Sequence, residues 1–212
     1  MPGKHVHFSH DVVFPPTPSP TFSSASLPSS YGPVTPPNAF NSYAPLTASG
    51  SVTLHEVLKF QGPYPPALVF DIRLPHQNVR PSANYLDPRV LSQTATKQPL
   101  PSLVLIHPAL GAWKIEVAPR SGKAVLVEDV LFAIYSSLRQ RASETDFQQL
   151  PPARQSSVVA AFTARWSSLP PEHQQIEKGK GLKRVDFLCN QVKFAGLSPS
   201  QWGPNCFELV LS

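Results

Sequence analysis

The stretch 124-AVLVEDVLFAIYSSL-138 is the most regular pattern in this 212-residue chain. Its apolar residues recur at helical spacing and predict one buried helix face. That face consists of Val127, Val130, Leu131, Ile134, Tyr135 and Leu138. Glu128 and Asp129 fall in the first turn and Arg139 and Arg141 at the end, an arrangement that suits the helix dipole. We expect a short strand over 124–127 to lead directly into this helix.

Strand patterns flank this helix on both sides. Residues 103–106 form an apolar run, Trp113, Ile115 and Val117 alternate with polar neighbours, and 107–111 should turn the chain between them. A second helix is expected over 153–167, opened by two prolines. Residues 192–197 and the alternating Phe207, Leu209 and Leu211 predict closing strands. The order predicts an α+β fold, with a mostly antiparallel sheet and two main helices packed on one face.

Weaker local patterns complete the prediction. Thr53 and Glu56 match a capping box, which predicts a short helix through Lys59. Residues 67–74 alternate as a half-buried strand that points Leu68, Phe70, Ile72 and Leu74 inward. Residues 75–101 are read as a long connection with a helical turn at 88–91. The polar segment 170–183 is expected to be a loop. Residues 184–189 are expected to form a strand with Val185, Phe187 and Cys189 inward and Arg184 and Asp186 outward.

The composition changes near residue 50. Residues 1–50 contain ten of the 26 prolines, and Lys4 and Asp11 are their only residues ionised at neutral pH. This segment has no hydrophobic period and can bury little apolar surface to offset the entropy of ordering. We therefore expect a disordered Pro/Ser/Thr-rich tail over 1–50 and a single α+β domain over 51–212.

Charge and hydropathy bear on whether the chain binds nucleic acid, spans a membrane or is secreted. The net charge of +5 is dispersed, and its one concentration, around Lys178, Lys180, Lys183 and Arg184, fits a solvated loop, so we expect no nucleic-acid partner. No apolar stretch is long enough to span a membrane. The first residues lack the apolar core of a signal peptide, so a cytoplasmic or nuclear location is expected. Cys189 and Cys206 are expected to be free thiols.

Several segments together resemble an uncharacterised domain family of unknown function from mushroom-forming (basidiomycete) fungi. The resemblance is carried by Thr53-Leu54-His55, Phe70-Asp71-Ile72-Arg73, Trp113-Lys114-Ile115-Glu116-Val117, Glu128-Asp129-Val130-Leu131, Lys183-Arg184-Val185-Asp186-Phe187-Leu188 and Phe194-Ala195-Gly196-Leu197. It covers most of residues 51–212. Ala112 stands where such proteins often have Pro. The resemblance implies a fungal, intracellular protein and brings no known activity, cofactor or catalytic residue.

The tail contains candidate linear motifs. Lys4-His5-Val6-His7-Phe8 looks like the short motif that docks on type-1 protein phosphatase, because an extended peptide projects Val6 and Phe8 to one side. A chance match remains the alternative, since the pattern is loose and Arg184-Val185-Asp186-Phe187 also fits it inside a predicted strand. Possible sites for proline-directed kinases are Thr17, Ser19 and Thr35.

The sequence also contains candidate groups for metal binding and for catalysis. His5, His7 and His10 can ligate a metal, but a flexible segment without supporting ligands favours solvated histidines, so no metal is expected. For an enzyme, the best group is Asp71, His107 and Asp186 with Arg73 and Arg184, which could meet across a sheet. Cross-strand ion pairing on a solvated face is the competing explanation.

No phosphate loop, nucleophile elbow, zinc signature or dinucleotide fingerprint is present, so no cofactor is expected. The sequence favours a non-catalytic interaction or regulatory protein, with a small enzyme of unrecognised type as the alternative.

Overall fold

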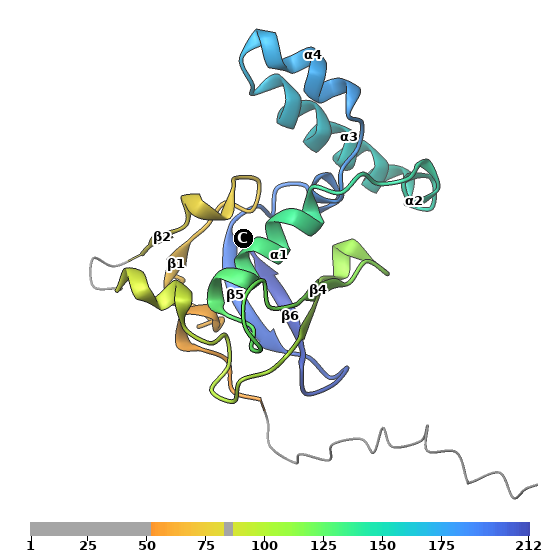
Figure 1. Ribbon diagram of the computed structural model, residues 1–212. Coiled ribbons are helices and arrows are strands. Elements are labelled where there is room, and N and C mark those ends of the chain that lie inside the picture. Colours follow the sequence, from red (N-terminus) through yellow and green to blue (C-terminus); the bar gives the residue numbers. More distant parts are fainter. Residues whose placement is uncertain (1–51, 83–86) are drawn as a thin grey trace, which may run out of the picture. The chain divides into compact units, whose positions relative to one another are not determined.

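A four-stranded mixed sheet lies at the centre of the computed structural model, which describes residues 52–82 and 87–212 (Figure 1). Its strands, in spatial order, are β4 (Ile115–Val117), β3 (Leu103–Ile106), β6 (Cys206–Leu211) and β5 (Phe194–Pro199). The β4–β3 and β6–β5 pairs are antiparallel, and β3 runs parallel to β6. A small second sheet pairs β1 (Leu68–Val69) with β2 (Arg80–Pro81), also antiparallel. The predicted α+β fold with a mostly antiparallel sheet is confirmed.

Helix α1 (Val127–Leu138) packs on one face of this sheet. Its buried residues join the inward residues of the strands in one hydrophobic core. Shared members are Val127, Val130, Leu131, Ile134, Leu138, Leu103, Leu105, Ile115, Val117, Phe207 and Leu209. The helix predicted from the opening pattern is confirmed, and β3 has its predicted bounds. All described residues belong to one of the two units into which the chain divides, Ala48–Ser212.

Three further α-helices and five 3₁₀ helices complete the helical structure of the described residues. The α-helices are α2 (Glu144–Gln148), α3 (Pro152–Ser167) and α4 (Pro171–Gly179), and the 3₁₀ helices are η2 (Glu56–Leu58), η3 (His76–Asn78), η4 (Pro88–Ser92), η5 (Pro108–Leu110) and η6 (Arg184–Leu188). The expected turns at 88–91 and 107–111 correspond to η4 and η5. Within 52–82 and 87–212, no helix has the length and apolar character needed to cross a membrane. Cys189 and Cys206 are both free, as predicted.

Three local predictions near the core need correction. The residue that caps η2 is His55, whose Nδ1 accepts from the amide of Val57 at 3.3 Å, rather than Thr53. The strand expected over 67–74 is limited to Leu68–Val69, because the chain turns after Ile72 and leaves Leu74 48% exposed. The strand expected over 124–127 is reduced to one isolated bridge between Leu126 and Thr94.

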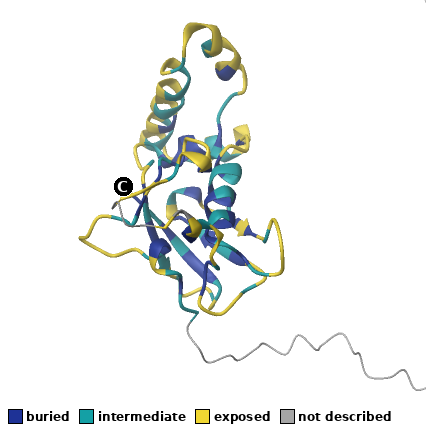
Figure 2. Cartoon of the chain, turned by 60° about the vertical axis from the view of Figure 1, so that its left-hand side comes forward, coloured by how far each residue is buried: buried dark blue, intermediate teal, exposed yellow. Residues whose placement is uncertain are grey.

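The region after α3 differs most from the prediction. Residues 171–179 form α4 instead of a loop, and 184–188 form η6 instead of a strand. Two main helices were expected to pack on one face of the sheet, and only α1 does so. Helix α3 matches the helix expected over 153–167, but its main contacts are with α4 and η6. Figure 2 shows α3 and α4 exposed over much of their surface. Helix α4, whose one buried residue is Glu177, gives no hydrophobic period from which it could be recognised.

The 3₁₀ helix η6 divides its apolar residues between two clusters. Val185 and Leu188, three positions apart and so on one side of a 3₁₀ turn, enter the main core. Phe187 faces a smaller cluster with Val158 of α3. Asp186, expected on a solvated strand face, is only 2% exposed. The alternation of apolar and charged residues that predicted a strand therefore belongs to a short helix that is buried on more than one side.

Arg165 of α3 connects these elements through buried hydrogen bonds. Its guanidinium donates to both carboxylate oxygens of Asp186, at 2.7 and 2.8 Å, and to Oε1 of Glu177 at 2.5 Å. Lys183 Nζ donates to the same Glu177 oxygen, and Lys180 Nζ donates to the other at 2.8 Å. Burial alone would raise the pKa of Glu177, but Lys180, Lys183 and Arg165 outweigh it and lower that pKa to about 2. These residues form the Arg165 network.

The segments 58–60 and 70–72 cover the outer edge of β5. Phe60 N donates to Leu197 O at 2.9 Å, and Phe194 N donates to Phe70 O at 2.9 Å. Gly196 permits this approach, because a Cβ at its position would lie 2.5 Å from the backbone of Phe60. The edge is therefore protected from pairing with another chain.

The Arg165 network predicts a pH-dependent stability. The pKa of Glu177 falls from 4.5 to about 2 on folding, which corresponds to about 3 kcal/mol. Because the folded carboxyl has the lower pKa, this contribution is complete above pH 4.5 and is lost as the pH falls towards about 2. In urea unfolding, Glu177→Gln should lose about 3 kcal/mol at neutral pH and approach wild type in acid. Glu56→Gln, at an exposed pair with Lys59, is the control and should change little. A wild-type advantage that persists unchanged into acid contradicts this account.

Gly196 and Gly203 provide a matched test of the covered edge. Their φ angles are +141° and +140°, so alanine is strained equally at both, but nothing closer than 3.8 Å would meet a Cβ at Gly203. We expect Gly203→Ala to cost about 1–3 kcal/mol from backbone strain. Gly196→Ala should cost roughly 1–3 kcal/mol more because it also overpacks Phe60. Equal losses in chemical denaturation would show that the close approach is unimportant.

Candidate functional site

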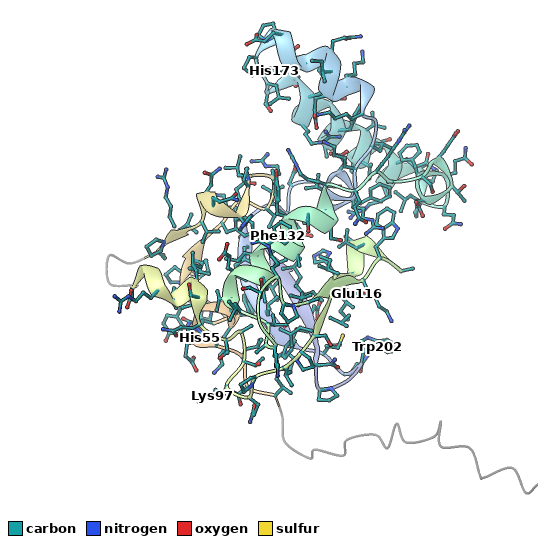
Figure 3. All side chains as sticks on the ribbon, in the orientation of Figure 1. His55, Lys97, Glu116, Phe132, His173 and Trp202 are labelled. Atoms are coloured by element: carbon teal, nitrogen blue, oxygen red, sulfur yellow. The ribbon has the colours of Figure 1, made fainter. Side chains whose placement is uncertain are left out.

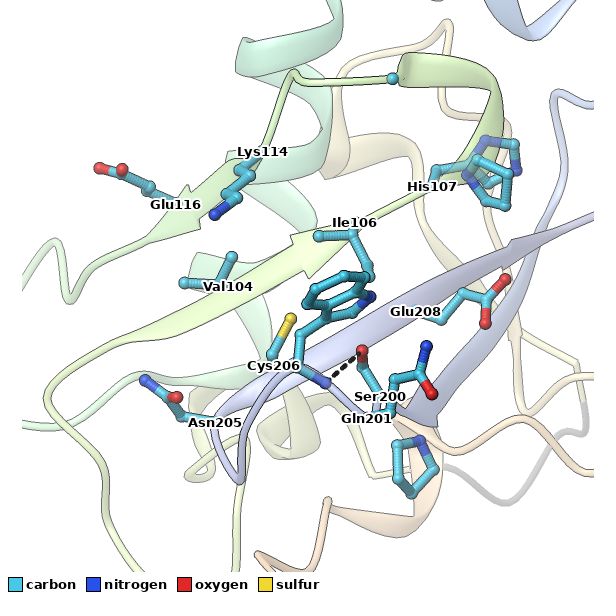
Figure 4. A pocket seen from close by; sticks show the side chains of 14 residues that line it. Val104, Ile106, His107, Lys114, Glu116, Ser200, Gln201, Asn205, Cys206 and Glu208 are labelled. Atoms are coloured by element: carbon cyan, nitrogen blue, oxygen red, sulfur yellow. Dashed lines mark hydrogen bonds between the residues drawn. The ribbon is translucent and has the colours of Figure 1, made fainter. Parts of the chain in front are cut away.

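The sheet face opposite α1 lines a hollow of about 850 Å³ (Figure 4). Strand alternation explains which side chains reach it, since Leu103 and Leu105 enter the core and Val104 and Ile106 point the other way. The neighbouring strands contribute Glu116, Cys206 and Glu208, and Lys114 stands just before β4. The floor is thus a short apolar stripe bordered by charges of both signs. We call this surface the open sheet face.

The loop between β5 and β6 adds Trp202 to this surface (Figure 3). The backbone amide of Trp202 donates to Ser200 Oγ at 3.2 Å, which supports the turn. The side chain is 75% exposed, the highest value among the large exposed apolar residues of the described range. A large indole left in water beside an apolar stripe is typical of a surface that binds another molecule.

His107 lies at the end of β3 and contributes to the open sheet face. Its Nδ1 accepts from the amide of Ala109 at 3.1 Å and so caps η5. Burial lowers the pKa of His107; the negative charge of Glu208 acts against this shift and the positive charge of Arg154 adds to it. Near neutral pH the imidazole is therefore uncharged, and the capping bond occupies the nitrogen that would have to accept a proton. This arrangement suits a structural role.

Asp71 and Arg73 form an ion pair with each other and do not converge with His107 on a common site. Arg73 Nη2 donates to Asp71 Oδ2 at 2.6 Å, and the Arg73 amide donates to Oδ1 at 3.0 Å. Burial would raise the pKa of Asp71, but the hydrogen bonds from Arg73 outweigh it and lower it. The pair closes a turn after β1.

Asp186 and Arg184 also have separate partners. Asp186 belongs to the Arg165 network, whereas Arg184 donates to Ser137 Oγ at 3.3 Å and lies over the Trp113 ring at 5.1 Å. The two residues are part of η6, so the predicted strand face does not exist.

Of the five residues considered for catalysis, Arg73 and Asp186 line one small hollow, whereas His107 lines the open sheet face. Because Asp186 lies in η6 and not on a strand, Asp71, His107 and Asp186 do not meet across a sheet. The described side chains also include no group of three or more His, Cys, Asp or Glu that could hold a metal ion.

The tail candidates lie outside the described residues. They are Lys4, Val6, Phe8, His5, His7, His10, Thr17, Ser19 and Thr35. The second match to the phosphatase pattern, at 184–187, is inside η6, where Val185 and Phe187 are buried. Docking through that copy would require unfolding, as the sequence indicated.

Sequence reasoning missed the residues that define the open sheet face. Trp202 stands in Ser200-Gln201-Trp202-Gly203, between two apolar strand patterns. A tryptophan in a polar, glycine-containing hairpin loop does not belong to the apolar face of either strand, so it is expected to be exposed. This position in the sequence could have identified Trp202 as a candidate binding residue. Lys114 and Glu208 gave no such signal, because single charges on strands are ordinary.

The comparisons with known proteins identify a family but no activity. A family model described as "Family of unknown function (DUF6699)" matches residues 68–204. No curated protein and no solved structure matches the chain. The match spans more than half of the chain and includes every strand of both sheets except the last, β6. The chain therefore belongs to the DUF6699 family, whose function is unknown.

Proposed function

We propose that the described region is a non-catalytic protein-binding module that docks a partner protein through the open sheet face. The observation that carries this proposal is Trp202, 75% exposed beside the apolar stripe of Val104, Ile106 and Cys206. An aromatic residue in such a position is the usual anchor of a protein interface.

The shape of the open sheet face favours a protein over a small molecule as its binding partner. Small-molecule sites enclose most of their ligand. Here the floor is one sheet face, and only His107 and Cys206 among the lining residues are buried. The bordering charges have both signs, which does not favour a polyanion. An apolar patch on a partner, with mixed charges around it, fits this surface best.

The same proposal includes the tail. Type-1 protein phosphatase is the candidate partner of Lys4, Val6 and Phe8, and phosphates on Thr17, Ser19 and Thr35 would each add about −1.5 to −2 charges to an almost uncharged segment. An intracellular location in the cytoplasm or nucleus and a fungal source belong to this proposal as well.

Trp202 and Tyr64 provide a matched test of the open sheet face. Both are exposed aromatics, at 75% and 71%, but only Trp202 borders the hollow. A photoreactive aromatic residue at position 202 of the full chain should crosslink one protein from the source organism, and the same group at position 64 should not. With that protein purified, Trp202→Ala should weaken binding by roughly 30-fold or more, as for a typical hot spot, and Tyr64→Ala should not. Equal effects of the two variants would exclude the open sheet face.

The phosphatase motif is tested separately. We expect a peptide of residues 1–14 to bind type-1 phosphatase in calorimetry and the Val6→Ala, Phe8→Ala double variant to lose binding, because both apolar contacts are removed. The same double substitution in the full chain should abolish binding, since the copy at 184–187 is buried. If the double variant and wild type bind equally, the motif is a chance match.

A further inference from the structure

Strand β4 has an outer edge whose backbone groups have no pairing partner among the described residues. Val104 N donates to Asn205 O, so the polar backbone groups of Val104 face β6. Because these groups alternate along a strand, those of Leu103 and Leu105 face β4, where they pair with Val117 and Ile115. The amide and carbonyl of Glu116, between these two residues, must therefore point away from the sheet.

Nothing in the described part of the chain pairs with this edge. The hydrogen bonds found among residues 52–82 and 87–212 include none from the backbone of Glu116 or Ala118 to a neighbouring segment. The opposite edge, on β5, is covered by 58–60 and 70–72. The sheet thus protects one edge and exposes the other, and an exposed edge is a template for another strand.

Helix α1 borders this edge and makes it a groove. A hollow of about 410 Å³ lies between β4 with the segment after it and the side of α1 that carries Phe132, Ala133 and Ser136. Figure 3 locates Glu116 on β4 and Phe132 on α1. A strand edge beside a helix is the geometry in which several domains bind an extended peptide by strand addition. We call this hollow the β4–α1 groove.

Two guanidinium groups mark the ends of the β4–α1 groove. Arg120 lies near the start of α1, with its guanidinium 4.2 Å from the centre of the Phe132 ring and in an exposed, 3.4 Å ion pair with Glu128. Arg184 lies near the other end of α1, beside Ser137, and its Nε is buried without a partner among the described residues. The carboxylate of Asp129, which also lines the groove, already accepts from two backbone amides.

We propose that the β4–α1 groove binds an acidic, extended peptide segment of a partner protein, which adds to β4 as a fifth strand of the sheet. The outward backbone groups of Glu116 pair with the peptide backbone, and carboxylates of the peptide meet Arg120 and Arg184. The small side chains of Ala133 and Ser136 leave room for the peptide side chains that face α1. This site is separate from Trp202, although β4 borders both surfaces.

The full chain is tested with a labelled peptide of about ten residues that alternates Val and Glu, and with its Val/Lys counterpart. Fluorescence anisotropy should show binding of the Val/Glu peptide at least about tenfold tighter than that of the Val/Lys peptide, because the charges at the groove ends are positive. Arg120→Glu should weaken the Val/Glu peptide about tenfold, whereas Arg80→Glu, an equal charge change on β2 away from the groove, should not. Trp202→Ala should leave this binding unchanged, which separates this proposal from that for the open sheet face.

Glu116→Pro tests the backbone pairing. Proline is tolerated on an edge strand where the missing N–H faces outward, so the fold should survive and peptide affinity should fall about tenfold. Amide exchange of the unsubstituted chain provides a second readout, in which the Val/Glu peptide should slow exchange at Glu116 more than on β5. Absence of Val/Glu binding, equal binding of both peptides, or protection that omits β4 would overturn the proposal. Tighter binding of a peptide of residues 1–14 would instead assign the groove to the chain's own tail.

Discussion

The Arg165 network is the interaction on which the arrangement outside the sheet depends. Arg165, Glu177, Lys183 and Asp186 each have side chains no more than 10% exposed, and they join α3, α4 and η6. Such a group of charges is stable only when every charge has its partner. Removing one side chain leaves another charge buried and unpaired, which costs about 3–5 kcal/mol of folding stability. The apolar contacts of α4 are too few to hold it, so its position is set by charge pairing and not by a hydrophobic face.

This network also determines the candidate sites. Asp186 accepts from the backbone amide of Lys183 at 2.8 Å, which starts η6 at Arg184. The start of η6 then places Arg184 over Trp113 and beside Ser137, at one end of the β4–α1 groove. A residue that sequence reasoning considered for catalysis thus acts in the structure by positioning its neighbour. In the pairs Asp71–Arg73 and Arg165–Asp186, each charge already has a partner within the described residues.

Which elements could be predicted from the sequence depends on what stabilises each of them. Helix α1, β3 and β6 are held by one buried face, so their apolar period is visible and they were predicted. Helix α4 is held by Glu177 and its cationic partners, and ion pairs distant in sequence leave no period. The 3₁₀ helix η6 buries Val185, Phe187 and Leu188 on more than one side, so its apolar pattern resembled that of a strand. The open sheet face was missed for a related reason, since its residues are those that the core pattern excludes. His107 was correctly placed at a strand end, but its hydrogen bond to Ala109 could be known only from the turn geometry.

Strand β4 accounts for both proposed surfaces through one property, its place at the edge of the sheet. Its inward residues, Ile115 and Val117, are fixed in the core, so the strand cannot move to satisfy its outer side. Its outward residue Glu116 and the preceding Lys114 border both the open sheet face and the groove. Within residues 52–82 and 87–212, segments of the chain cover the edge of β5 and none pairs with the edge of β4, so the two edges of this small sheet are treated differently. A folded module with one protected and one available edge is suited to binding partners in a defined register.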